Sequence, residues 1–167
     1  AKEGDENKYK LPLPLINEKN CHFSFAGLKS AVANVVAENR CTEKFKRDMS
    51  ASFQKTINTI LSTKARHAIE RFQRINKSKK TIKIVVAGGV AANKSLRSAL
   101  KELESTHRCE FLFPSIKYCT DNGAMIALAG IERYERDMFN NLDFKPRPRW
   151  PLDKNALFMK GKRVVGQ

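Results

Sequence analysis

The apolar positions divide the first part of the chain into an extended part and a helix. Residues 11–16 are apolar but contain two prolines, which favours an edge strand or an extended segment. Residues 22–25 alternate polar and aromatic side chains, so a strand is predicted there, with residues 17–20 as the turn of a hairpin. Apolar residues at helical spacing then predict a short amphipathic helix over 28–40. Residues 1–10 are polar and charged and are predicted to be disordered.

One apolar stripe continues through the middle of the chain and predicts a long helix. Thr42 can cap the start of this helix with its hydroxyl group. A stripe of this length indicates core packing rather than a cofactor site. Its members are Phe45, Met49, Phe53, Ile57, Ile60, Leu61, Ala68, Ile69, Phe72 and Ile75.

The second half alternates predicted strands with predicted helices. Residues 82–87 are rich in β-branched side chains, which predicts a strand buried on both faces. A helix over 92–104 and a strand over 109–113 follow, and then a helix over 120–134 that Thr120 can cap. Strands that alternate with helices pair in parallel, so the fold class is predicted to be α/β. Residues 144–152, with three prolines, are predicted to be extended.

Composition and cysteine usage narrow the class of protein. A hydrophobic share of 41% and a charged share of 29% are typical of a globular domain. No run approaches the roughly 18 apolar residues of a transmembrane helix, so no membrane contact is expected. The four cysteines are scattered, without a CxxC pair, which favours a reducing cytoplasm and small buried side chains over a metal site.

The net charge of +15 raises the question of a polyanionic partner. Lys and Arg outnumber Asp and Glu by 32 to 17, and one basic segment spans residues 64–83 with Glu70 as its only acid. A second cluster, Lys145, Arg147 and Arg149, adjoins the sole tryptophan, Trp150. Clustered cations favour an RNA-facing surface, because they displace counterions from phosphates. The alternative is a solvated basic helix end.

Gly88, Gly89 and Asn93 form the first candidate site. They lie where the strand predicted over 82–87 runs into the next helix, and ligands bind at such junctions in α/β sheets. Glycines let a ligand approach the backbone, and Asn93 can hydrogen-bond a ribose or a phosphate. The alternative is an ordinary tight turn, with Asn93 as a helix cap.

Asp121 forms the second candidate site, again between a strand and a helix. It follows Asn93 by one strand–helix unit, so both are predicted at the same edge of the sheet. A carboxylate there can ligate a divalent metal if other ligands come from elsewhere. The alternative is a capping carboxylate at a helix start.

Four segments together resemble one enzyme family. Residues 23–32 are similar to its FSFSGLKTAV segment, 86–97 to AGGVxANxxLR and 119–127 to CTDNGAMIA. Residues 149–152 resemble the RWPL tail of its bacterial members. The family is tRNA N6-adenosine threonylcarbamoyltransferase, formerly called a glycoprotease, and the resemblance covers residues 11–152 in order and spacing.

The resemblance implies an actin, Hsp70 and sugar-kinase (ribonuclease H-like) fold, with a mixed sheet flanked by helices. Residues 1–152 would be the carboxyl-terminal lobe and residues 153–167 a tail. The implied reaction moves threonylcarbamoyl from threonylcarbamoyl adenylate to N6 of an adenosine beside the anticodon, in tRNAs reading codons that start with A. The implied partners are tRNA, a paralogous protein and an ATPase, all in the cytoplasm.

The resemblance also assigns roles to the candidate residues. Asn93 would contact the adenylate, with Gly88 and Gly89 against the nucleotide, and Asp121 would ligate one divalent metal ion, expected to be iron. No residue presents itself as a catalytic general base.

The chain departs from the family pattern in ways that affect activity. The HxxxH pair that supplies the other metal ligands and the glycine-rich substrate loop are both missing from this sequence. Ala26 replaces a serine and His22 an aspartate. The chain is therefore expected to be one half of a longer protein, to hold metal poorly alone and not to catalyse transfer alone. The alternatives are a non-catalytic RNA-binding module and a small-molecule kinase of the same fold superclass.

Overall fold

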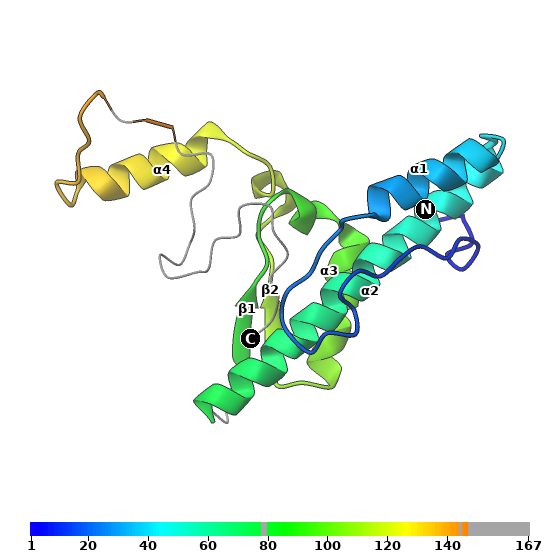
Figure 1. The fold of residues 1–167 in the computed structure, drawn as a ribbon. Coiled ribbons are helices and arrows are strands. Elements are labelled where there is room, and N and C mark those ends of the chain that lie inside the picture. Colours follow the sequence, from blue (N-terminus) through cyan, green and yellow to red (C-terminus); the bar gives the residue numbers. More distant parts are fainter. Residues whose placement is uncertain (78–79, 144, 147–167) are drawn as a thin grey trace. The chain divides into compact units, whose positions relative to one another are not determined.

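The computed structural model describes residues 1–77, 80–143 and 145–146, which fall into two compact units. The first unit is residues 1–122, and the second begins at Gly123; each is described by itself. Most of the predicted extended segment 144–152 and the whole tail 153–167 lie outside the described residues. The elements in chain order are α1 (Leu28–Glu38), α2 (Glu43–Asn76), β1 (Ile82–Val85), the 3-10 helix η1 (Gly89–Ala92), α3 (Lys94–Lys101), the 3-10 helix η2 (Glu102–Ser105), β2 (Cys109–Leu112), the 3-10 helix η3 (Ile116–Tyr118) and α4 (Gly123–Tyr134) (Figure 1).

The long helix α2 confirms the helix predicted from its apolar stripe, but the interpretation of the stripe as core packing holds only in part, because Phe53, Phe72 and Ile75 are exposed. Thr42 caps its start, because the Thr42 hydroxyl accepts a hydrogen bond from the Phe45 backbone N–H at 3.1 Å. Lys77 ends the helix in the left-handed region (φ 48°), where its N–H donates to the Gln73 carbonyl. Although α2 is 34 residues long, many of its side chains are charged. Within the described ranges, no helix combines the length and the apolar character needed to cross a bilayer.

The sheet of the first unit consists of β1 and β2, which pair in parallel as predicted. Ile82 aligns with Cys109, and Val85 with Leu112. The strand at 82–87 was predicted to be buried on both faces, and this is wrong for the described residues: the side chain of Val85 is 69% exposed. Helices α2 and α3 cover one face only, the one that presents Ile84. The structure thus has helices and a small parallel sheet, within an α/β arrangement.

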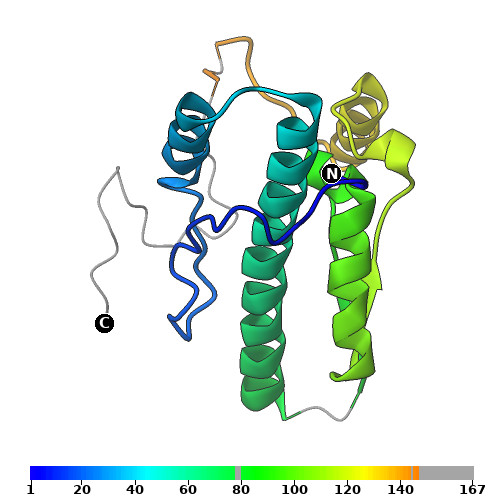
Figure 2. The ribbon, with the colours of Figure 1, turned by 90° about the vertical axis from the view of Figure 1, so that its right-hand side faces the viewer.

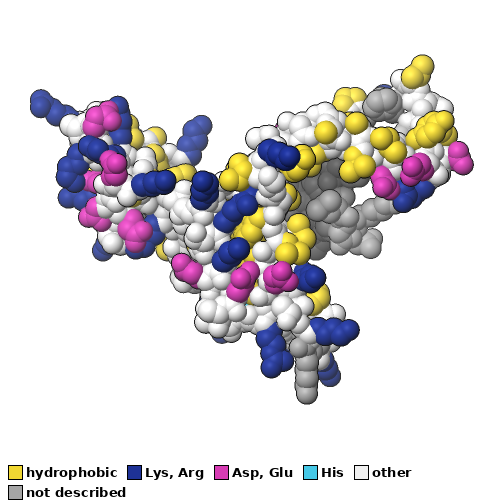
Figure 3. Space-filling model, turned by 180° about the vertical axis from the view of Figure 1, so that it is seen from behind, with side chains coloured by type: hydrophobic (Ala, Val, Ile, Leu, Met, Phe, Trp, Pro, Cys, Tyr) yellow, Lys and Arg dark blue, Asp and Glu magenta, His cyan; other side chains and the backbone are white. Residues whose placement is uncertain are grey.

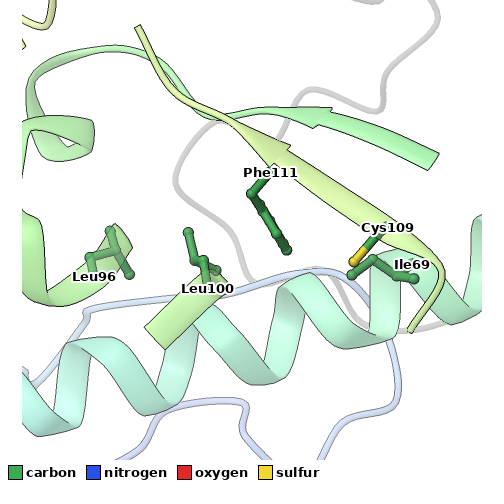
Figure 4. Packing of buried hydrophobic residues seen from close by; sticks show 5 residues of the cluster. All are labelled: Ile69, Leu96, Leu100, Cys109 and Phe111. Carbon is green, nitrogen blue, oxygen red and sulfur yellow. The ribbon is translucent and has the colours of Figure 1, made fainter. Parts of the chain in front are cut away.

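The main core of the first unit lies between α2, α3 and the sheet. Figure 4 shows side chains from the three elements converging, and Figure 2 shows α2 and α3 side by side. Burying these apolar surfaces is the main favourable contribution to folding. The five buried members are Ile69, Leu96, Leu100, Cys109 and Phe111.

A second, smaller core joins α1 to the first half of α2. It consists of Leu11, Leu28, Phe45 and Met49. Gly27 precedes α1 with φ 80°, a left-handed conformation that favours glycine and turns the chain onto α2.

Two predictions for the first 25 residues are wrong, and the first concerns residues 1–10. Residues 1–10, expected to be disordered, lie against α2: the Asp5 N–H donates to Asp48 (2.9 Å) and the Tyr9 N–H to the Ser52 hydroxyl (3.1 Å). The Lys44 ammonium and the Asp5 N–H, which both donate to the Asp48 carboxylate, hold its pKa below the usual range. The expectation of disorder was therefore wrong, because polar side chains of α2 satisfy the backbone of this segment.

The predicted hairpin is also absent from the described residues. Residues 11–16 and 22–25 are not strands, and residues 14–17 form a turn instead. Pro12 and Pro14 lack the N–H groups that a strand ladder needs, which leaves too few donors for stable pairing.

Truncating Leu100 tests whether the cluster in Figure 4 holds the first unit together. Leu100→Ala is expected to lower the free energy of unfolding by about 2–5 kcal/mol, because it leaves a cavity between α3 and the sheet. Val85→Ala, on the exposed face of the same sheet, is the control and should cost less than about 1 kcal/mol. Denaturant unfolding followed by circular dichroism measures both. Equal losses in the two variants would contradict this placement of the core.

Candidate functional site

The loops after β1 and β2 meet at one edge of the sheet. A side-chain carbon placed on Gly89 would lie 3.6 Å from the Cys119 carbonyl oxygen, so the two loops approach to van der Waals distance. Because the strands are parallel, both loops leave from the same edge. The loops that carry the two sequence-predicted sites are therefore neighbours.

Arg97 of α3 ties these loops together, a role that the sequence interpretation did not assign. Its guanidinium donates to the Ala91 carbonyl in the first loop and to the Pro114 carbonyl (2.8 Å) and Cys119 sulfur (3.3 Å) beside the second. The planar donor fork of arginine suits several fixed acceptors at once. The signal was available, since Arg97 is the last residue of the segment that resembles AGGVxANxxLR.

Gly88 and Gly89 form an open turn after β1. Gly88 has φ 87°, a conformation that strongly favours glycine, and no atom lies within 4 Å of the position where it would carry a side chain. Both glycines are exposed, so a ligand can reach the backbone. The turn continues as η1, which delays the start of α3 to Lys94, two residues later than predicted.

Asn93 caps α3. Its Oδ1 accepts from the Leu96 N–H at 3.1 Å, and its Nδ2 donates to the Gln54 side chain of α2 at 2.7 Å. The capping alternative is thus confirmed. Asn93 retains a second amide N–H and a second lone pair on Oδ1, so contact with a ligand stays a prediction compatible with this geometry.

Asp121 is exposed at the end of the second loop. Its carboxylate makes no hydrogen bond or ion pair with any described residue. Thr120 does not cap the following helix as predicted, because α4 begins only at Gly123. The carboxylate of Asp121 is therefore available for a ligand or a metal ion.

The donor set around Asp121 fits one ligand of a metal site rather than a complete site. Metal ions of the predicted kind need several oxygen, nitrogen or sulfur ligands. Among the residues that the structure describes, no three His, Cys, Asp or Glu side chains gather closely enough to hold one. Other ligands must therefore come from outside the described residues if Asp121 ligates a metal.

An apolar cavity of about 680 Å³ adjoins Asn93, and sequence reasoning missed it. Asn93 and Gln54 supply polar groups at its wall, whereas Asp121 does not line it. The rings of Phe23 and Phe25, whose centroids are 5.6 Å apart, contribute from the segment wrongly predicted as a strand. The alternating aromatic pattern was therefore a signal for apolar surface, but not for a strand.

Two of the four cysteines match the expectation of small buried side chains. Cys109 and Cys119 are buried, whereas Cys21 is partly exposed and Cys41 exposed, and all four are free. Burial raises the pKa of the Cys109 thiol, and the nearby Glu104 carboxylate adds to this effect.

Comparison with known proteins links both loops to one family. A sequence model described as tRNA N6-adenosine threonylcarbamoyltransferase matches residues 1–128. The curated protein of that name from Pelagibacter ubique (strain HTCC1062) is 48% identical over 164 residues, covering 98% of this chain and 45% of the relative. Its counterpart in Rickettsia rickettsii (strain Sheila Smith) is 45% identical over 154 residues, covering 92% and 45%. The chain thus spans about 45% of the length of these relatives.

Substitutions at Asn93 test its role as the cap of α3. Asn93→Ala is expected to lower the free energy of unfolding by about 1 kcal/mol, because the Leu96 N–H loses its acceptor. Asn93→Ser keeps an oxygen at the cap and should recover most of that loss. Thermal unfolding measures both variants. If Asn93→Ala leaves stability unchanged, the observed cap does not stabilise α3.

Proposed function

Because the chain belongs to the tRNA N6-adenosine threonylcarbamoyltransferase family, we propose that it is the carboxyl-terminal part of such an enzyme. The whole enzyme transfers threonylcarbamoyl from threonylcarbamoyl adenylate to N6 of the adenosine beside the anticodon, in tRNAs that read codons starting with A. The reaction belongs to the cytoplasm, where tRNA is modified. The proposed helpers are a paralogous protein and an ATPase.

One observation carries the proposal: the family match includes both loops that meet at the sheet edge. The match to residues 1–128 contains Gly88, Gly89, Asn93 and Asp121. The Arg97 contacts and the approach of Gly89 to Cys119 support a single site built from both loops. In this proposal the adenylate lies against the exposed glycine turn, and Asn93 hydrogen-bonds it with the polar capacity that capping leaves free.

Asp121 is proposed to ligate one divalent metal ion, with iron as the expected ion. Its exposed carboxylate has no competing partner among the described residues, which supports this role. The metal would act as a Lewis acid toward the carbamoyl or phosphate oxygen. The chain's own residues orient the adenylate, and holding the amine near the carbamoyl carbon supplies much of the remaining acceleration.

The remaining part of the enzyme is proposed to cover the apolar surface of the first unit. The apolar cavity beside Asn93 and the exposed side chain of Val85 present apolar area that a completed actin, Hsp70 and sugar-kinase fold would bury. The relatives have more than half of their length outside the matched region, which is enough chain for a second lobe.

Substitution of Asp121 in the full-length protein tests the proposed reaction. Asp121→Asn is expected to lower metal content and to reduce threonylcarbamoyl adenosine formation on the order of 100-fold, because the amide is a poorer metal ligand. Metal analysis and mass spectrometry of nucleosides from digested tRNA measure the two effects. Asp143 is an exposed carboxylate in the second unit, so Asp143→Asn is the matched control and should retain both the metal content and the modification of tRNA.

The nucleoside assay, a tRNA-binding assay and an ATP phosphotransfer assay on the full-length protein together distinguish the alternative functions. If the unsubstituted full-length protein is a non-catalytic RNA-binding module, it will bind tRNA but leave the adenosine of that tRNA unmodified. A small-molecule kinase would transfer the terminal phosphate of ATP to a sugar or an acid. Either result would overturn the proposed function.

The isolated chain should expose apolar surface that the full-length protein buries. Residues 1–167 alone are expected to bind the dye ANS several-fold more strongly per mole than the full-length protein, because the cavity beside Asn93 is open. Dye fluorescence at equal molar concentrations measures the difference. Placing a charge in the cavity lining, as in Phe25→Glu, should lower the signal of the isolated chain. Equal fluorescence of the two proteins would contradict the proposed cover.

A further inference from the structure

A second pocket, separate from the sheet edge, lies on the carboxyl-terminal half of α2. It has a volume of about 830 Å³. One wall is α2, and the other is the loop that carries Lys19 and Asn20. We call it the basic pocket. Its charged and polar lining is Lys19, Asn20, Arg66, His67, Glu70, Arg71 and Arg74.

Lys64 does not line the basic pocket itself, but it holds the loop that forms one of its walls. The sequence placed Lys64 at the start of a basic surface segment, but its side chain is 3% exposed, so this residue is not on the surface. Its ammonium donates to the backbone carbonyls of Glu18 (2.7 Å) and Asn20 (3.3 Å). A buried charge needs such partners, and here they fix the loop against α2. The His67 ring adds a polar contact of 3.3 Å to the Asn20 carbonyl.

The charge of the basic pocket is far from balanced. Among the described residues that line it, Glu70 is the only acid, and it pairs with Arg66 at 3.1 Å. Burial alone would raise the pKa of Glu70, but the hydrogen bond and charge of Arg66, together with His107, hold this pKa below its usual range. Glu70 is thus ionised and its charge is matched by Arg66. Lys19, Arg71 and Arg74 have no ion pair with any described residue.

The spacing of these cations fits an extended polyanion better than a single small anion. Of the cations without an ion pair, Lys19 lies on the loop wall, whereas Arg71 and Arg74 lie three positions apart on the α2 wall, so positive charge lines both sides of a pocket of about 830 Å³. An arginine fork binds phosphate oxygens in pairs, and exposed arginines gain from counterion release at a nucleic acid backbone.

On one face of the molecule, cations and acids are interspersed. On the face seen in Figure 3, Lys and Arg side chains stand at several separate positions with Asp and Glu between them. The net charge of +15 therefore does not locate a partner by itself, whereas the basic pocket does.

We propose that the basic pocket is a binding site for the phosphate backbone of tRNA. Lys19, Arg71 and Arg74 contact successive phosphates, and Lys64 holds the loop that brings Lys19 into place. The site contributes affinity but no chemistry, and it rests on the proposed function only in taking tRNA as the polyanion.

Charge reversal in the full-length protein tests the site. Arg71→Glu/Arg74→Glu is expected to raise the Kd for a labelled tRNA transcript roughly tenfold or more. The slope of log K against log salt should fall by about 1.5–2, because two phosphate contacts are lost. The control is Arg40→Glu/Lys101→Glu, which makes the same change in net charge at exposed cations outside the pocket. Equal weakening in the two double variants would overturn the proposal.

Three further measurements make the result unambiguous. Arg71→Gln/Arg74→Gln removes the charges without adding acids and should show a smaller loss in the same direction, with circular dichroism checking that α2 stays folded. Inorganic phosphate should compete with tRNA only weakly. If phosphate instead saturates the parent protein and the pocket variants lose phosphate but keep tRNA binding, the pocket is a small-anion site and the proposal fails.

Modification of the adenosine by the parent protein is scored separately. If the parent modifies tRNA and the pocket variants bind it normally, only the basic pocket is refuted. If the pocket variants lose tRNA binding but the parent modifies nothing, the pocket stands and the proposed function falls.

Discussion

The apolar stripe of α2 is the constraint on which the rest of the first unit depends. It buries Phe45 and Met49 against α1 in one core and Ile69 against α3 and β2 in another. Because one rigid helix serves both cores, its polar side chains are held at fixed positions. Gln54 can therefore orient Asn93, and Lys64 can fix the loop that forms the basic pocket. The sites are consequences of packing that the apolar stripe makes possible.

The sequence predicted best the structural features that depend on residues close to one another in the chain. The long helix and its Thr42 cap follow from local spacing and one hydroxyl group, and the parallel pairing follows from alternation of strands and helices. The prediction of a hairpin failed because strand pairing needs backbone N–H donors, and Pro12 and Pro14 have none. The docking of residues 1–10 was not predicted, because Asp48 and Ser52 bind backbone groups that lie 43 positions away in the sequence.

The sequence predicted where the residues of the candidate site lie along the chain, but not the hydrogen bonds that join them to other elements. The glycine turn and Asn93 were located correctly from the strand–turn–helix pattern, since their geometry is local. The bond from Asn93 to Gln54 joins residues 39 positions apart, and no pattern in the sequence encodes it. Lys64 is a second contact that the sequence does not reveal. A lysine within a basic segment is normally exposed. Only the tertiary structure shows that the Lys64 ammonium donates hydrogen bonds to two backbone carbonyl groups.

The rigidity of α2 also fixes the distance between the two proposed sites. Gln54, beside Asn93, and Arg74, in the basic pocket, are twenty positions apart on one uninterrupted helix, or about 30 Å along its axis. A small substrate such as an adenylate cannot reach both, whereas a folded tRNA is large enough to do so. In the proposed function, contacts at the far end of α2 therefore add binding energy but take no part in the chemistry at the sheet edge. If the proposed function holds, loss of those contacts should raise the KM for tRNA, whereas kcat and adenylate binding should depend on the loops that Arg97 contacts.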